Sequence, residues 1–175
     1  MIEPKVFIAK VSKDSNGKYS IIDGTTKDVM TDFEGTYYQS ADGVEAYGTP
    51  RVYTEEYPES KELDVFFPEN TTFKNTEFTL KLYFIAPKDI TDNDAIDYIN
   101  DAYNAFTEFI TGSKILYWDN VRKRKLMLAL TDSVKPSTTS VLSGREYLAV
   151  SFKFKNIYGK SFPLEDETEL PLVTI

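Results

Sequence analysis

The sequence predicts an α+β protein that is mainly β: an antiparallel β-sandwich or rolled barrel flanked by one amphipathic α-helix at about residues 92–110. Short runs in which apolar and polar residues alternate recur along the chain, as half-buried strands require. One longer segment instead places apolar residues at three- and four-residue steps, as an amphipathic helix requires. The chain has 175 residues, 41% of them hydrophobic and 14% aromatic. This is enough for a single domain over residues 1–175.

The chain is expected to open with a β-hairpin. Residues 6–12 and 18–22 are β-type runs, and the Asn16-Gly17 pair between them readily adopts the positive φ of a tight turn. Together with Asp14, this pair also resembles the start of a calcium-binding loop. Lys18 stands at the next ligand position, however, and no Glu closes the loop, so we interpret the group as a plain turn.

Residues 25–68 show no clean period and are expected to form a long, Tyr-rich loop region. Tyrosine rings cover surface at low entropic cost, so this composition favours contact with another subunit or partner. The alternative is that some of the tyrosines simply cover the sheet. The residues expected at a subunit interface are Tyr37, Tyr38, Tyr47, Arg51 and Tyr53 from this region, with Arg122 and Arg124 from a later basic run.

A clear strand leads into the predicted helix. Residues 77–85 alternate strictly, and Pro87 ends the run. The helix has Thr91 as its expected N-cap and Gly112 just past its end. Its apolar stripe needs a surface to pack against, and the sheet is the candidate. The predicted helix–sheet core consists of Ile96, Ile99, Tyr103, Phe106 and Ile110 on the helix, Leu80, Leu82 and Phe84 on the preceding strand, and Leu148, Val150, Phe152 and Phe154 on a later strand at 145–155.

The charged residues on the polar face of the predicted helix are all acidic. This face carries Asp92, Asp94, Asp97, Asp101 and Glu108, and it has no Lys or Arg. The two acids in the first turn suit the helix dipole. The whole face is either solvated or awaits basic groups from elsewhere.

The second half is expected to contain another hairpin, a loop and an extended end. Residues 114–118 and 121–130 form the hairpin strands, and the basic run 122–125 begins the second of them. This strand is apolar on both faces near its end, which predicts cover on both sides. Residues 137–144 read as a Ser/Thr-rich loop, and 162–175 as an extended C-terminal arm.

Composition removes most catalytic chemistry. The chain has no Cys and no His, which excludes thiolate and imidazole catalysis and most transition-metal sites, so we expect no cofactor. Its net charge of −8 disfavours binding to nucleic-acid phosphates or anionic membranes. Glu59-Ser60-Lys61 matches half of a nuclease motif, and Glu55-Glu56 offers carboxylates for a glycosidase pair. The tripeptide is common by chance, and the sequence cannot place two carboxylates at the separation that a glycosidase requires. Nothing here demands an enzyme.

The first ten residues lack the apolar core and cleavage site of a secretory signal. No apolar stretch approaches the ~18 residues that a transmembrane helix requires. We therefore expect a protein made and kept in the cytoplasm, without a membrane partner.

The order of these segments resembles a known family. A hydrophobic strand at 78–85 leads into the helix, then into Lys114-Ile-Leu-Tyr-Trp-Asp119 and a second hairpin strand, and the pattern closes with residues 147–159. The stretch at 48–56 resembles the long loop of such proteins. Across roughly residues 40–160, the chain is similar to bacteriophage and prophage tail proteins of the tail-tube and distal-tail group.

The resemblance implies a structural, non-catalytic protein that forms hexameric or trimeric rings around a lumen that passes DNA. Its partners would be copies of itself and neighbouring tail proteins, with no specific nucleic-acid binding. It would reside in the bacterial cytoplasm during assembly and then in the virion, as a tube, distal-tail or tail-completion component. An acidic lumen would repel the phosphate backbone.

Two other functions stay open at this point. The first is a carbohydrate- or surface-binding β-sandwich module that uses Trp118, Tyr117 and Tyr38 as stacking platforms. The second is a small enzyme that relies on a pair of carboxylates.

Overall fold

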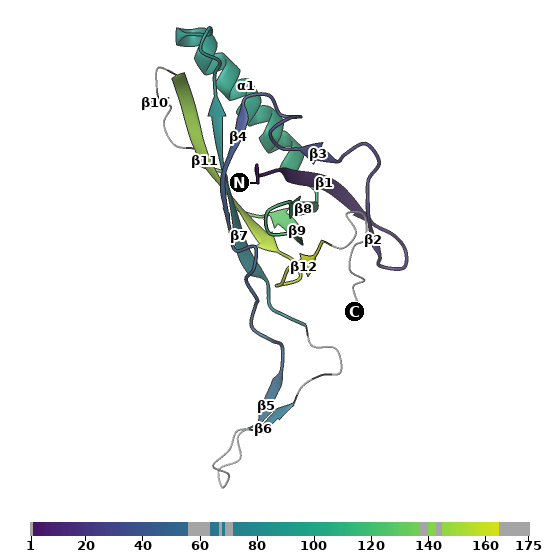
Figure 1. The fold of residues 1–175 in the computed structure, drawn as a ribbon. Helices are drawn as coiled ribbons and strands as arrows, with labels where there is room; N and C mark the ends of the chain where they lie inside the picture. The colour runs from purple at the N-terminus through teal and green to yellow at the C-terminus, as the bar shows by residue number, and fades with distance from the viewer. Residues whose placement is uncertain are drawn as a thin grey trace.

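The computed structural model describes residues 2–55, 64–66, 68, 72–136, 140–142 and 145–164. It consists of a ten-stranded antiparallel sheet, a separate two-stranded ribbon and one helix (Figure 1). The elements are β1 (Val6–Lys13), β2 (Tyr19–Ile21), β3 (Lys27–Asp28), β4 (Thr36–Asp42), β5 (Tyr53–Glu55), β6 (Asp64–Phe66), β7 (Thr76–Ile85), α1 (Asp92–Ile110), β8 (Ile115–Asp119), β9 (Arg124–Leu130), β10 (Ser140–Leu142), β11 (Arg145–Asn156) and β12 (Phe162–Pro163). The predicted class, α+β and mainly β, is confirmed.

The sheet is open, so the closed form of the rolled barrel is not realised. Its main strand order is β2-β1-β8-β9-β11-β7-β4, with β3 beside β1, β12 beside β9, and β10 beside one end of β11. The central pair is β7 and β11, which match from Thr76 opposite Asn156 to Ile85 opposite Tyr147. Strong curvature brings the turn after β8 back toward β4, where Arg122 Nη1 donates to the Ala41 carbonyl at 2.9 Å.

The helix α1 occupies the predicted residues and packs on one face of β7 and β11 (Figure 1). Thr91 is at the N-cap position, although its side chain makes no capping hydrogen bond. At the other end, the Thr111 hydroxyl donates to the Thr107 carbonyl at 2.6 Å. Gly112 follows with a φ of 79°, which glycine adopts without strain.

One predicted core residue, Ile96, lies outside the core. Its side chain is 39% exposed, whereas Ala95, Ile99, Phe106 and Ile110 are buried. Successive residues are about 100° apart around the helix axis. The four buried residues therefore lie on one side of the helix, and Ile96 lies at the margin of that side. The inclusion of Ile96 in the helix–sheet core was therefore wrong.

The other predicted core side chains lie in the main hydrophobic cluster between α1 and the sheet. Phe106 is fully buried, with its ring centroid 5.0 Å from that of Phe152 and 5.2 Å from that of Phe33. Tyr103 is partly buried and packs edge-on against Phe84. The buried members from the strands are Leu80, Leu82, Phe84, Leu148, Val150, Phe152 and Phe154.

A second apolar cluster covers the opposite face of β1, β8 and β9. It contains Trp118, Leu116 and Met127, and it alternates along the strands with residues of the main cluster such as Tyr117. Residues 125–128 of β9 are consequently buried without a break. This explains why the predicted strand is apolar on both faces.

Three segments that were expected to lack regular secondary structure contain paired strands. Residues 25–68 include β3, β4, β5 and β6, so the loop prediction is wrong for these parts. Residues 137–144 include β10, which pairs with β11. The expected C-terminal arm begins as β12, and residues 165–175 lie outside the described residues. The basic run also begins in a turn rather than a strand, because β9 starts at Arg124.

The opening hairpin forms as predicted. Ser12 lies opposite Ser20, and Gly17 has a φ of 81° in the turn. The Asp14 Oδ1 accepts hydrogen bonds from the backbone N–H groups of Asn16 and Lys18. Asp14 thus organises the turn through the backbone.

Candidate functional site

The described part of the sheet has two unpaired edges at one end. The strand β4 pairs only with β7, and the strand β10 pairs only with β11. Thr36 of β4 lies opposite Phe84, and Ser140 of β10 lies opposite Tyr147, which is itself opposite Ile85. The free edges therefore border the same end of the β7–β11 pair, on either side of it. Edge strands present backbone donors and acceptors that another chain can pair with.

The edge strand β4 carries two of the predicted interface tyrosines. Tyr37 is 44% exposed, and Tyr38 is half-buried. Burial raises the pKa of Tyr38, and the nearby positive charge of Arg122 partly offsets this rise. Tyr38 and Arg122 are thus neighbours, held together where the turn after β8 meets β4.

Asp119 fixes the turn that presents Arg122. This carboxylate is buried, and its Oδ1 accepts from the backbone N–H of Val121 at 3.0 Å and of Arg122 at 2.7 Å. Its Oδ2 accepts from the Tyr117 hydroxyl at 3.2 Å. Since these bonds satisfy the carboxylate locally, we assign Asp119 a structural role.

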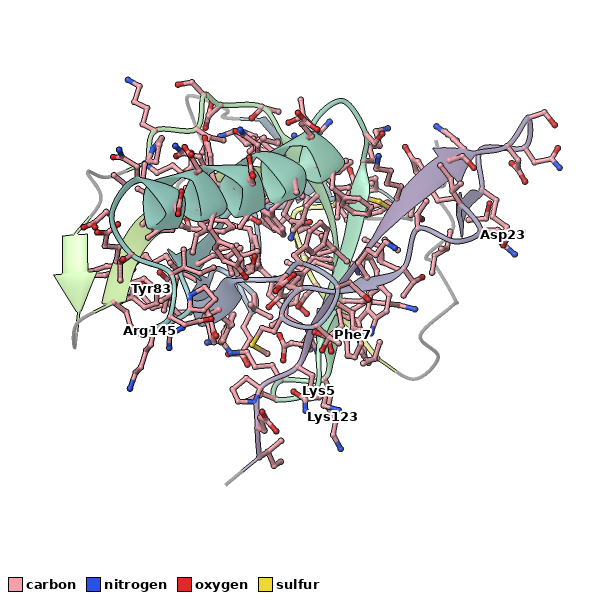
Figure 2. The ribbon with its side chains drawn as sticks, turned by 90° about the horizontal axis from the view of Figure 1, so that it is seen from above. Lys5, Phe7, Asp23, Tyr83, Lys123 and Arg145 are labelled. Carbon is pink, nitrogen blue, oxygen red and sulfur yellow. The ribbon has the colours of Figure 1, made fainter. Side chains whose placement is uncertain are left out.

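The face of β4, β7 and β11 opposite α1 is polar and accessible. Tyr37 lies opposite Tyr83, whose ring packs edge-on against Tyr147 at 5.6 Å. Figure 2 shows Tyr83 on the opposite side of the strands from α1. We call this surface the outer face. Its residues alternate with the core residues and comprise Tyr37, Ser40 and Asp42 of β4, Glu77, Thr79, Lys81, Tyr83 and Ile85 of β7, and Arg145, Tyr147, Ala149, Ser151, Lys153 and Lys155 of β11.

Two cross-strand ion pairs lie on the outer face, beside the further basic residues Arg145 and Lys153. Lys81 Nζ lies 3.3 Å from Asp42 Oδ2, and Lys155 Nζ lies 3.0 Å from Glu77 Oε1. The hydrogen bond from Lys155 lowers the pKa of Glu77 and raises that of the lysine. The outer face is accordingly not acidic, and the expectation of an acidic surface fits the helix instead.

The helix carries the concentrated negative charge. Asp92, Asp94, Asp97, Asp101 and Glu108 are all exposed. Within the described residues, the ion pairs of the protein are the two on the outer face. The acidic face of α1 is thus open to solvent in the single chain.

Between β4 and β7 the chain leaves the body as a long two-stranded arm (Figure 1). Its strands pair through the Lys74 N–H donating to the Thr49 carbonyl and the Arg51 N–H donating to the Thr72 carbonyl, both at 2.9 Å. Further out, β5 pairs with β6. Sequence reasoning missed this arm, because the pairing at its root joins residues more than twenty positions apart, Thr49 with Lys74 and Arg51 with Thr72.

The predicted interface residues therefore do not form one surface. Tyr47 and Arg51 are exposed on the arm, and the backbone of Tyr53 is in β5. The side chain of Tyr53 lies outside the described residues. Arg124 is engaged inside the chain, since its Nε donates to the Ser161 hydroxyl at 2.9 Å.

Two rings proposed as stacking platforms are buried. Tyr117 has no exposed surface, and Trp118 is 3% exposed. Trp118 stacks on Phe7 with the ring centroids 5.5 Å apart. A sugar ring cannot reach either side chain, so both must be withdrawn as platforms. Tyr38 is partly buried and packs against the main cluster.

Among the described residues, no cluster of His, Cys, Asp and Glu could hold a metal ion. The Glu59-Ser60-Lys61 and Glu55-Glu56 candidates lie outside the part whose side chains are described.

No protein-family model matches the chain, and the curated proteins contain no sequence match. In the described part of the chain, α1 is too polar to cross a membrane.

Proposed function

We propose that this chain is a non-catalytic structural subunit of a phage tail, which assembles with copies of itself into a ring. The observation that carries the proposal is the pair of free edges, on β4 and β10, at one end of the β7–β11 pair. They flank a four-strand unit, β10-β11-β7-β4, in which every neighbouring pair is antiparallel. A contact between two different edges is heterologous, and such contacts build rings when the rotation closes.

We call the proposed contact between β4 of one copy and β10 of the next the joint. The strand topology determines the relative direction of these two strands. Because the unit contains an even number of alternating strands, β4 and β10 run in opposite directions. A rotation about an axis along the strands preserves their direction. The β4 strand of one copy therefore meets the β10 strand of the next in the antiparallel sense, and the sheet continues between subunits.

The helix determines which face of this continued sheet is free. Since α1 covers one face of β7 and β11, we place the outer face toward the passage. Lys81 and Lys155 there are neutralised by Asp42 and Glu77. Arg145 and Lys153 lie on the same face, so its residues carry four positive and two negative charges. The lining is then weakly basic, where the sequence suggested an acidic one, and it would attract the DNA backbone.

The arm extends the β4–β7 hairpin beyond the sheet and is the second contact element. It emerges from the strands of the proposed joint and reaches past the body (Figure 1). Its exposed apolar group, Phe66, is 51% accessible. We propose that the arm contacts a neighbouring copy or an adjoining tail protein in the virion.

A cysteine cross-link tests the joint, because the natural chain has no cysteine. Tyr37→Cys is combined with Ser140→Cys, whose backbone lies opposite Tyr147 in the register. A short bismaleimide should convert concentrated protein into a ladder of covalent oligomers. The control combines Tyr37→Cys with Asn104→Cys on the exposed face of α1, and it should remain uncross-linked. Equal ladders from both pairs, or none from the first, would argue against the joint.

Carbohydrate binding is the weaker candidate. Of its three proposed platforms, two are buried in the core. On the outer face, the rings of Tyr83 and Tyr147 meet at 84° and so present no flat surface for a sugar.

A further inference from the structure

Three chain segments meet at the root of the arm. Residues 43–48 enter the arm, residues 72–74 leave it, and residues 157–160 follow β11, whose last residue Asn156 lies opposite Thr76 at the start of β7. The Gly48 N–H donates to the Gly159 carbonyl at 2.6 Å, and the Gly159 N–H donates to the Asn156 carbonyl at 3.2 Å. The arm is thus bonded to a turn more than eighty residues away in the sequence. We call this junction the root clamp.

Two glycines of the root clamp enclose one backbone carbonyl. A Cβ added to Gly48 would lie 1.8 Å from the Lys74 oxygen, and one added to Gly159 would lie 2.1 Å from the same atom. Atoms in proteins do not approach this closely, so neither position accepts a larger residue without a backbone shift. The carbonyl itself has little freedom, because the N–H of Lys74 is bonded to Thr49 in the arm ladder.

Aromatic side chains brace the same junction. The rings of Tyr47 and Phe73, from the two arm strands, pack edge-on at 5.6 Å. Lys160 Nζ lies 5.5 Å from the centroid of Phe73 and 5.1 Å from that of Phe162. A cation between two rings links the arm strand to the segment after β11.

Nearer the sheet, the chain entering the arm is also tightly packed. A Cβ on Gly43 would lie 2.4 Å from the Glu77 carbonyl, and Gly43 has a φ of 89° that only glycine adopts readily. Val44 beside it is fully buried. Both strands of the arm are therefore fixed to the body before they leave it.

We propose that the root clamp is a positioning device that holds the arm in one direction in the free subunit. An isolated two-stranded ribbon is only marginally stable and would swing about its root. An arm that is already fixed in the free subunit loses little conformational entropy when it binds a partner, so association costs less free energy. This inference depends on the proposed function only in assigning the arm a partner; the rigidity of the arm is a property of the single chain.

Pulsed electron spin resonance on the monomer tests the clamp. Spin labels at Phe66→Cys on the arm and Ser151→Cys on the outer face report the distance between arm and body, and both positions are exposed. In dilute wild-type background, we expect one narrow distance distribution. A broad distribution in that background would overturn the proposal without any variant.

Glycine variants test the cause of the rigidity. Gly159→Ala should shift and broaden the distribution, and Gly48→Ala should do the same. The matched control is Gly24→Ala, because Gly24 has a φ of 76°, close to the 68° of Gly159, but no atom lies within 4 Å of its added Cβ. The control carries the same backbone strain and should leave the distribution unchanged. Unchanged distributions in both clamp variants, with folding verified by circular dichroism, would overturn the proposal.

The clamp and the proposed function fail in different ways. A narrow monomer distribution without ring assembly would refute the ring and leave the clamp intact. Rings formed by a subunit whose arm is broadly distributed would refute the clamp alone.

Discussion

Replacement of Phe106 by alanine tests whether the helix is attached to the sheet by the buried aromatic cluster. The side chain is fully buried, and its ring contacts those of Phe33, Phe84 and Phe152. Removing a buried phenylalanine costs about 3–5 kcal/mol, through lost transfer free energy and the cavity left behind. Domains of this size are stable by about 5–15 kcal/mol. Phe106→Ala should therefore remove a large share of the stability.

Ile96→Ala is the control on the same helix. Ile96 is 39% exposed, and alanine has the higher helix propensity, so we expect a change below about 1 kcal/mol. Urea unfolding followed by circular dichroism measures the free energy of unfolding of both variants. The two values can be compared if the m-value is unchanged. Equal losses for the two variants, or a loss below about 1 kcal/mol for Phe106→Ala, would refute the described helix–sheet packing.

Three further predictions concern single residues. Trp118 is the only tryptophan and is buried, so its emission should be blue-shifted and resist acrylamide quenching; a red-shifted, quenchable emission would place it on the surface. Burial raises the pKa of Tyr158 to about 12, so this group stabilises the fold below the unfolded pKa of about 10, and that contribution is lost as the pH rises from about 10 to 12. Tyr158→Phe should flatten this part of the stability–pH curve, and an unchanged alkaline slope would contradict the shift. Lys123 has a φ of 51°, which glycine adopts with less strain. Lys123→Gly should therefore raise the unfolding free energy by about 0.5–1 kcal/mol in the same urea assay. A lower unfolding free energy would show that the lysine side chain stabilises the fold by more than the backbone strain costs.

The helix and the central strands were predictable because their burial repeats with a regular period. Residues 78–84 alternate between core and outer face without interruption, and the structure pairs them as an unbroken ladder with β11. The helix boundaries followed from Thr91 and Gly112. Ile96 was misassigned because spacing identifies a stripe but not where the sheet beneath it ends.

The strand β4 escaped detection for a specific reason. Its register shifts between Tyr38 and Ser40, so Thr36 and Ala41 both face the core although they are five positions apart. A bulge of this kind breaks the period of two on which strand recognition depends. Gly35 and Gly43, which bracket the strand with positive φ, were the available signal.

The arm and the joint depend on long-range pairing. Both faces of the arm project away from the body, so no alternation of apolar and polar residues is required there. The root clamp brings Gly48 and Gly159 together from distant segments, which no local pattern encodes. The free edges were likewise unpredictable, since an edge is defined by the strand order of the finished sheet.

Electron microscopy of the concentrated protein tests the central claim most directly. The account predicts annular particles in which density continues from β4 of each subunit into β10 of the next, with the outer face lining the hole. Assemblies in which both edges face solvent, or protein that remains monomeric at every concentration and forms no Tyr37→Cys/Ser140→Cys cross-link, would contradict it.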